Sequence, residues 1–162
     1  MKKINLKITL CYQHKSEFYS KLDLLECVSQ AVNIVNSEIE TFNLEFEEIE
    51  EGNQSINIHE NVHKVIEESH LVIFEISDLN KNVLYELGLA KGLRKKFILI
   101  REEGIEENLP FDISPFQFMT YSSKDLISFK NHLAGKIKRI LQNLSPENIL
   151  SQGDINNLLA KY

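Results

Sequence analysis

A wholly apolar segment followed at once by an amphipathic helix pattern is the feature that most narrows the possible folds of this chain. Leu71-Val-Ile-Phe74, together with Ile76, offers no polar face, which is typical of a central strand in a parallel sheet. The segment from Asn82 to Lys95 then gathers its apolar side chains on one side of a helix. A buried strand that leads into a helix is the first half of a βαβ unit.

One carboxylate, Glu86, lies in the apolar sector of that helix. At about 100° per residue, this sector comprises Val83, Leu84, Leu87, Leu89, Ala90 and Leu93. Glu86 falls between Ala90 and Leu93, just after the carboxyl end of a buried strand, where open α/β sheets bind their ligands. Two interpretations are open: a functional carboxylate, or a structural one that pairs with an internal lysine or caps the loop after the first strand.

Strand and helix patterns alternate along the chain. We expect strands at 4–11, 42–47, 71–76, 97–100 and 117–121, and helices at 16–36, 55–68, 82–95 and 124–144. The second strand has one polar face, as edge strands do, whereas the third and fourth are apolar on both faces. The pattern predicts an α/β, flavodoxin-like fold: a five-stranded parallel sheet in the order 2-1-3-4-5 with helices on both faces. Lys7 does not fit, because that order buries the first strand.

The composition limits the classes of function. With 43% hydrophobic and 26% charged side chains, the 162 residues suit one soluble domain, placed at 1–144, with a C-terminal helical appendix at 145–162. The net charge of −6 argues against an obligatory nucleic-acid-binding protein. The sequence lacks an apolar run of membrane-spanning length and a signal-peptide pattern, so we expect a cytoplasmic protein without a membrane partner.

The two cysteines, Cys11 and Cys27, lack the spacing of metal ligands, and we expect both to be reduced. Cys11 ends the first strand. It is therefore either a small buried hydrophobe or a catalytic thiol, because strand ends point at active sites.

The run Asp78-x-Asn-x-Asn-Val-x-Tyr-Glu-Leu-Gly-x-Ala90 resembles the signature of the nucleoside 2-deoxyribosyltransferase-like and TIR-like families. Residues 10–18 are similar to the first box of a TIR domain, and 109–113, Leu-Pro-Phe-Asp-Ile, to the late part of the same group. The resemblance extends over about residues 4–141. In both families the matching glutamate acts at the anomeric carbon of a ribosyl group, which implies that role for Glu86. The resemblance also implies homo-oligomers, in which a neighbouring subunit can complete the site.

The expected site lies where the ends of the first and third strands meet, with loop 12–17 facing loop 77–82. The candidate substrate-binding residues are Tyr12, Asp78, Asn80, Asn82 and Asp112. We expect Tyr12 to stack on the base, and Asp78 with the two asparagines to hold the ribose and phosphate side near a helix N-terminus. Asp78 and Asp112 are candidate acids for a leaving base, and the interpretation that competes with this role is an ordinary loop or helix-start aspartate, which the sequence favours.

The chain departs from the transferases at one place, because Asn82-Val-Leu stands where their motif has an aspartate and a glycine. An acid for the leaving base is therefore not obviously supplied. Nicotinamide in NAD is already a cation and leaves as a neutral molecule, so one carboxylate suffices. We expect cleavage of an N-glycosidic bond, with NAD as a substrate and no separate cofactor. Resemblance to TIR-like enzymes implies hydrolysis to ADP-ribose or cyclisation to a signal in bacterial antiviral defence.

Two other functions compete with NAD cleavage. The first is a nucleoside 2-deoxyribosyltransferase. The second is a non-catalytic module that binds a nucleotide at the same place or assembles with partners. Gly88 and Gly92 flank Tyr85 on the outer side of the helix, and each costs about 1 kcal/mol relative to alanine. Close approach of another helix, within the fold or across a dimer, would compensate for this cost; the alternative is glycine tolerated under a loop.

His59-Glu-Asn-Val-His63 matches the H-E-x-x-H pattern of zinc proteases. On a helical wheel both histidines lie at the edge of the buried sector and Glu60 points outward. The three side chains would then form a surface cluster, and we expect no metal site.

Overall fold

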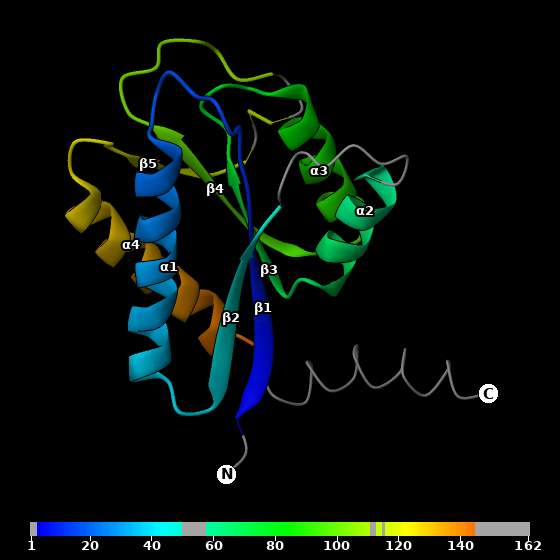
Figure 1. The fold of residues 1–162 in the computed structure, drawn as a ribbon, viewed down its shortest axis with the longest axis vertical. Coiled ribbons are helices and arrows are strands. Elements are labelled where there is room, and N and C mark those ends of the chain that lie inside the picture. Colours follow the sequence, from blue (N-terminus) through cyan, green and yellow to red (C-terminus); the bar gives the residue numbers. More distant parts are fainter. Residues whose placement is uncertain (1–2, 50–57, 111–112, 115, 145–162) are drawn as a thin grey trace.

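The computed structural model describes residues 3–49, 58–110, 113–114 and 116–144, without the side chains of 58–60. In chain order, the elements are β1 (Ile4–Cys11), α1 (Lys21–Glu38), β2 (Phe42–Glu48), α2 (Ile58–Glu68), β3 (Leu71–Glu75), α3 (Lys81–Gly92), β4 (Lys96–Glu102), β5 (Phe118–Tyr121) and α4 (Leu126–Gln142) (Figure 1). The strands form one parallel, five-stranded sheet in the order β2-β1-β3-β4-β5. The α/β flavodoxin-like prediction is confirmed.

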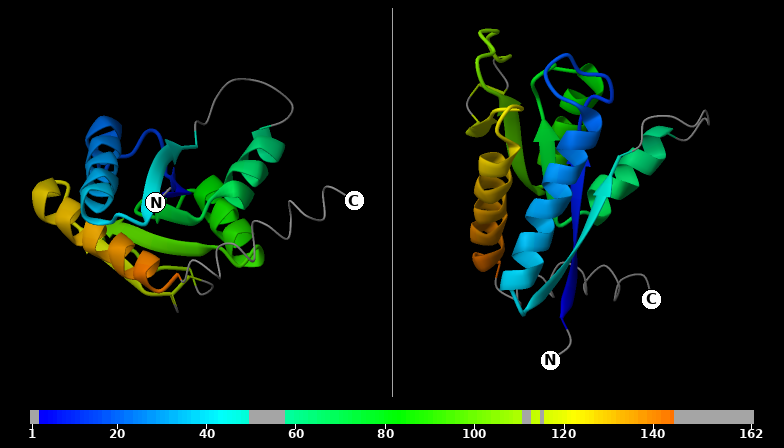
Figure 2. Two further views of the ribbon diagram at one scale, coloured as in Figure 1. Left: turned by 90° about the horizontal axis from the view of Figure 1, so that it is seen from below. Right: turned by 60° about the vertical axis from the view of Figure 1, so that its left-hand side comes forward.

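Helices cover both faces of the sheet. Helices α1 and α4 lie together on one face, and α2 and α3 lie on the other (Figures 1 and 2). Successive β3 side chains alternate between the two layers: Leu71 and Ile73 belong to the core under α1 and α4, and Val72 and Phe74 to the core under α2 and α3. All five β3 residues are buried, as predicted for a central strand. Burial of one such side chain stabilises the fold by about 1.5–3 kcal/mol.

Strand β2 is an edge strand, as its alternating sequence predicts. Phe42 and Leu44 are buried, whereas Asn43 and Glu45 are exposed. Its neighbour β1 carries Lys7, which the predicted order should bury. The side chain of Lys7 is instead 37% exposed, and its Nζ donates to Glu68 Oε2 at 2.8 Å. The long aliphatic stem lets the ammonium group reach the end of α2, so the central position of β1 is compatible with a lysine.

The first helix was predicted to begin too early. It starts at Lys21, with Ser20 as its N-cap accepting from the Asp23 amide. In the preceding loop, Ser16 Oγ accepts a hydrogen bond from the Phe18 amide at 3.0 Å. Such a local side-chain turn competes with helix formation, and this is why the helical pattern from residue 16 onward was misleading.

The helix that carries Glu86 ends earlier than predicted, at Gly92 instead of Lys95. Arg94 has a φ of 55°, in the left-handed region, and the Lys95 amide donates to Ala90 O at 2.9 Å. This closing turn leads the chain directly into β4.

Within the described part of the chain, the helices lack the length and apolar character that a membrane crossing requires. The predicted appendix at 145–162 and the candidate residue Asp112 lie outside the described residues. Their predicted roles therefore stay predictions.

Candidate functional site

Glu86 lies in the second turn of α3, on the face that packs against the sheet. The helix begins at the N-cap Asn80, whose Oδ1 accepts hydrogen bonds from the backbone amides of Asn82 at 2.8 Å and Val83 at 3.4 Å. This cap starts the helix just after the carboxyl end of β3. Glu86 is 5% exposed and is buried on the same side of α3 as Leu87. The helical wheel predicted its inward position correctly.

Cys11, the last residue of β1, is fully buried on the same face of the sheet. Burial, followed by the negative charge of Glu86, raises the pKa of its thiol well above its ordinary value. The thiol therefore stays protonated. This environment favours a structural or positioning role for Cys11 over that of a catalytic thiolate.

The loops that follow β1 and β3 face each other, as the predicted strand order requires. Gln13 joins them: its Nε2 donates to Asp78 Oδ1 at 3.3 Å, and its Oε1 accepts from Asn80 Nδ2 at 2.8 Å. Residues 12–19 and 76–80 therefore form one connected pair of loops at the carboxyl edge of the sheet. Two of the candidate residues, Asp78 and Asn80, lie together there, and exposed Asn82 lies in the first turn of α3.

Asp78 has the environment of a carboxyl group that holds its proton more firmly than usual. It is partly buried, and this burial raises its pKa. A hydrogen bond with Ser16 acts in the opposite direction, and the nearby charge of Glu17 adds to the rise. Asp78 is therefore the described residue of this loop pair that suits the role of an acid for a leaving base.

Tyr12, predicted to stack on a base, is 2% exposed. Its hydroxyl donates to Glu48 Oε2, and its ring stacks on His14 with centroids 4.9 Å apart. It belongs to the core under α1 and α4, on the face of the sheet opposite Glu86. Contact with a base would therefore require the loop after β1 to move.

A second buried carboxylate, Glu75 at the end of β3, was missed by the sequence reasoning. It is 2% exposed, and it points toward α1 and α4 because it follows Phe74 by one residue. The hydroxyl of Ser77 donates to Glu75 Oε1, as does Tyr121 Oη at 3.3 Å. The other carboxyl oxygen of Glu75, Oε2, has no hydrogen-bond partner within the described structure.

Burial raises the pKa of Glu75 to about 7, although the hydrogen bonds from Ser77 act in the opposite direction. Near neutral pH this side chain is therefore close to the midpoint of its titration. Perturbed carboxyl groups of this kind are frequent at functional sites. The signal that could have found Glu75 is its position as the one charged residue in the apolar run 71–76.

Of the three ligand-type residues in the H-E-x-x-H pattern, the structure describes the side chain of His63. His63 Nδ1 lies 3.9 Å from Glu67 Oε2, with both side chains well exposed. Among the described residues, no group of three or more His, Cys, Asp or Glu side chains could hold a metal ion. The side chains of His59 and Glu60 are outside that description.

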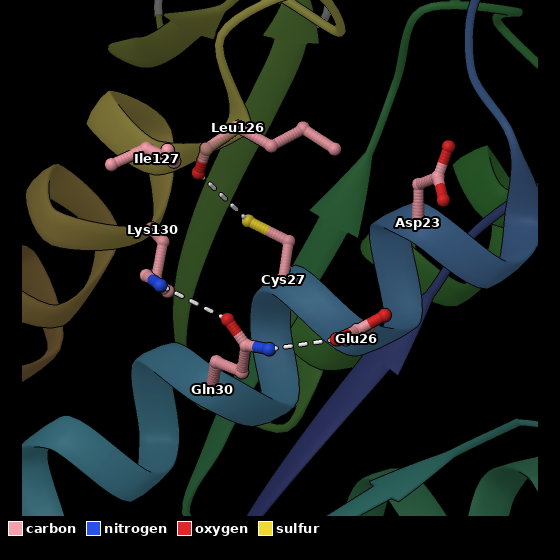
Figure 3. A pocket seen from close by; sticks show the side chains of 7 residues that line it. All are labelled: Asp23, Glu26, Cys27, Gln30, Leu126, Ile127 and Lys130. Atoms are coloured by element: carbon pink, nitrogen blue, oxygen red, sulfur yellow. Dashed lines mark hydrogen bonds between the residues drawn. The ribbon is translucent and has the colours of Figure 1, made fainter.

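A surface hollow lies elsewhere, between α1 and α4 (Figure 3). It is lined by Asp23, Glu26, Cys27, Gln30, Leu126, Ile127 and Lys130. Lys130 Nζ donates to Gln30 Oε1 at 3.0 Å, and Cys27 Sγ donates to Leu126 O at 3.5 Å. These contacts join the two helices across the hollow, on the face of the sheet away from Glu86, so the hollow is not part of the Glu86 site.

Comparisons with known proteins leave the family open. No family model matches the chain, and no curated protein matches it. A solved structure that is similar carries the name "putative lipoprotein from Peptoclostridium difficile 630 (fragment)". It is 14% identical, with a TM-score of 0.44, over 83% of this chain and 96% of that one. Likeness at this level carries no argument about function.

Proposed function

We propose that this protein cleaves the N-glycosidic bond of a nucleotide, with NAD as the leading substrate and Glu86 as the residue that acts at the anomeric carbon. The observation that carries the proposal is the burial of Glu86 just behind the carboxyl edge of the sheet. A carboxylate screened from water acts more strongly on developing positive charge than an exposed one. The likeness of residues 78–90 to ribosyl-handling families supports the same role.

In the proposed reaction, the bond between the ribosyl anomeric carbon and the nicotinamide nitrogen breaks. Its electron pair goes to the nitrogen, so the pyridinium leaves as neutral nicotinamide. Glu86 stabilises the oxocarbenium ion or traps it as an ester. Water then takes up the ribosyl group and gives ADP-ribose, or the adenine of the same substrate takes it up and gives a cyclic product. Either product could serve as a signal in antiviral defence.

Substrate binding is proposed at the loop pair 12–19 and 76–80 and at the first turn of α3. Asn82 is exposed there, and the amide-rich start of a helix suits a phosphate. We place the reaction in the cytoplasm, where cysteines such as the two unpaired ones here stay reduced. Exposed Tyr85 and open space around Gly88 leave the outer face of α3 accessible to a second copy of the chain.

A nucleoside 2-deoxyribosyltransferase is the second candidate, and Asp78 is the observation that favours it. Adenine or guanine leaves well only when it is protonated, and the raised pKa of Asp78 suits a proton donor. The protein should therefore be assayed in parallel with NAD and with purine deoxynucleosides as substrates. Binding of NAD without release of nicotinamide would favour the third possibility, a non-catalytic nucleotide-binding module.

The test is nicotinamide release from NAD, followed by chromatography, in the wild-type protein and two variants with the same change of charge. Glu86→Gln removes the proposed catalytic carboxylate and should lower the rate by at least about a hundredfold. Glu67→Gln is the control, because that side chain is 61% exposed on α2, and it should leave the rate unchanged. Circular dichroism checks that both variants fold. A rate for Glu86→Gln close to that of the control would refute the role of Glu86.

A further inference from the structure

Arg101 is a buried cation near the end of β4, on the face of the sheet that carries Glu86. It is 6% exposed, whereas the other two arginines of the chain, Arg94 and Arg139, are exposed. Leu99, two residues earlier on β4, belongs to the core under α2 and α3. Side chains two residues apart on a strand share a face, so Arg101 lies on the α2 and α3 side as well.

Hydrogen bonds tie the chain on either side of Arg101 to the start of the loop that follows β3. The Ile76 amide donates to Ile100 O at 3.0 Å, and the Glu102 amide donates to Ser77 Oγ at 2.7 Å. This loop is one of the two at the proposed binding site, and it leads into α3. Arg101 therefore lies beside that site, at the edge of the sheet where parallel α/β proteins bind their ligands.

The charge of Arg101 has no counter-ion among the described residues. A guanidinium is always protonated and carries five N–H donors. Nη2 of Arg101 donates to the backbone oxygen of Glu107 at 2.6 Å, whereas the buried Nε has no hydrogen-bond partner. In the described part of the chain, no carboxylate oxygen lies within 4.0 Å of this guanidinium. A neutral side chain could donate to one carbonyl, so this bond does not account for a buried charge, which proteins normally pair.

The loop 103–110, which contacts Arg101 through Glu107, can make room for an anion. None of its residues is buried, so displacing it breaks few apolar contacts. Its acidic residues Glu103, Glu106 and Glu107 are exposed, where water and salt screen their charges, so they do not neutralise the guanidinium. A phosphate oxygen is a stronger acceptor than a backbone carbonyl, and the planar guanidinium suits bidentate binding of a phosphate.

We propose that Arg101 binds a phosphate group of the substrate, so that the site selects nucleotides over nucleosides. The inference rests on the proposed function in placing the nucleotide at the Glu86 site, whereas phosphate binding does not depend on turnover. The diphosphate of NAD pairs with the buried charge. A nucleoside has no anionic group and leaves that charge unpaired. Arg101 thus favours NAD cleavage over the transfer of deoxyribose between nucleosides.

Binding of ADP and of adenosine, which differ by the diphosphate, is measured by isothermal titration calorimetry. Wild-type protein should bind ADP at least about tenfold more tightly than adenosine. Arg101→Gln should weaken ADP binding by about tenfold or more and leave adenosine binding unchanged, with Arg101→Lys in between, because lysine keeps the charge and loses the planar fork. Arg139→Gln, the same charge change on the exposed side of α4, is the matched control and should bind like the wild type.

A second measurement needs no change at Arg101. Its Nε–H signal in nuclear magnetic resonance is the arginine signal that remains when Arg94 and Arg139 are replaced by lysine. ADP should shift this signal, and adenosine should leave it in place. An unmoved signal at saturating ADP overturns the inference, as does equal affinity of the wild type and Arg101→Gln for ADP. Binding of inorganic pyrophosphate without binding of ADP would indicate a site for a free anion, and also overturns it.

Kinetics separate this inference from the proposed function. In the nicotinamide-release assay, Arg101→Gln should raise KM for NAD by about tenfold or more and change kcat by less than about threefold, because the phosphate is bound alike before and during the reaction. A wild-type protein that releases no nicotinamide would refute the proposed cleavage. The ADP titrations would still decide whether Arg101 binds a phosphate.

Discussion

Glu75 gives the sharpest test of the electrostatics at the end of β3. Its side chain is 2% exposed, and burial raises its pKa from 4.5 to about 7. In the unfolded chain the carboxyl group is hydrated and keeps its ordinary pKa. The folded state therefore binds this proton more tightly than the unfolded state does, and folding is favoured when the group is protonated.

The difference of about 2.5 pKa units corresponds to roughly 3 kcal/mol, at 1.36 kcal/mol per unit. The sign follows from the direction of the shift. This stabilisation is fully present below about pH 4.5 and is lost as the pH rises through about 7. Glu75→Gln replaces the carboxyl group with a neutral amide that can still accept from Ser77 and Tyr121. The variant should therefore gain stability relative to the wild-type protein as the pH rises, by up to roughly 3 kcal/mol at about pH 8.

The measurement is the free energy of unfolding in urea at several values between about pH 5 and about pH 8, for wild type, Glu75→Gln and the exposed control Glu67→Gln. Titration of all other groups is common to the proteins and cancels in the difference. The difference between Glu75→Gln and wild type should rise with pH, whereas the difference for the control should stay flat. A constant difference for Glu75→Gln would show that Glu75 titrates alike in both states, and would refute the reasoning.

Two positions, Gly88 in α3 and the N-cap Asn80, give further predictions. Gly88→Ala should raise the free energy of unfolding by about 1 kcal/mol, because a Cβ there meets nothing within 4 Å and alanine is the better helix former. The opposite result, a loss of stability together with a smaller particle in light scattering, would indicate that a second copy of the chain packs against this face. Asn80→Ala should cost about 1 kcal/mol through loss of the N-cap. Asn80→Asp keeps the capping oxygen, so it should preserve stability. It removes the hydrogen bond that Asn80 Nδ2 donates to Gln13, which joins the two loops of the proposed binding site, so it should raise KM for NAD. Equal stability losses in the two Asn80 variants, measured by urea unfolding, would contradict the capping role.

The fold was predictable because its signals are periodic and repeated. Apolar segments without a polar face identified β3 and β4 as central, and alternation identified β2 as an edge, which together leave few strand orders. The inward position of Glu86 could also be predicted from the sequence, since an amphipathic helix has one buried sector and a carboxylate within that sector is easily recognised. Both predictions depend only on which face a residue occupies.

Predictions that depended on loop conformation were less successful. The helical pattern from residue 16 onward gave no sign that Ser16 would form a local turn and delay helix α1 to Lys21. The sequence also gave no sign that Tyr12 would be buried with its hydroxyl donating to Glu48, 36 residues away. Glu75 was overlooked for a different reason. Strand β3 is buried on both faces, so its sequence has no alternation between polar and apolar residues. Periodicity therefore could not predict which groups surround the Glu75 carboxylate.

Glu75 bears directly on the choice of substrate. A carboxyl group with a pKa of about 7 could in principle supply the proton that a purine leaving group needs. However, Glu75 is 2% exposed and lies on the α1 and α4 face, whereas Glu86 lies on the α2 and α3 face. The hydroxyls of Ser77 and Tyr121 contact it directly. Its proton could reach a base beside Glu86 only through such hydroxyls and around the edge of the sheet. Glu75 therefore supplies no acid at the proposed site. Asp78 stays the candidate proton donor for a purine, whereas the proposed cleavage of NAD needs neither group.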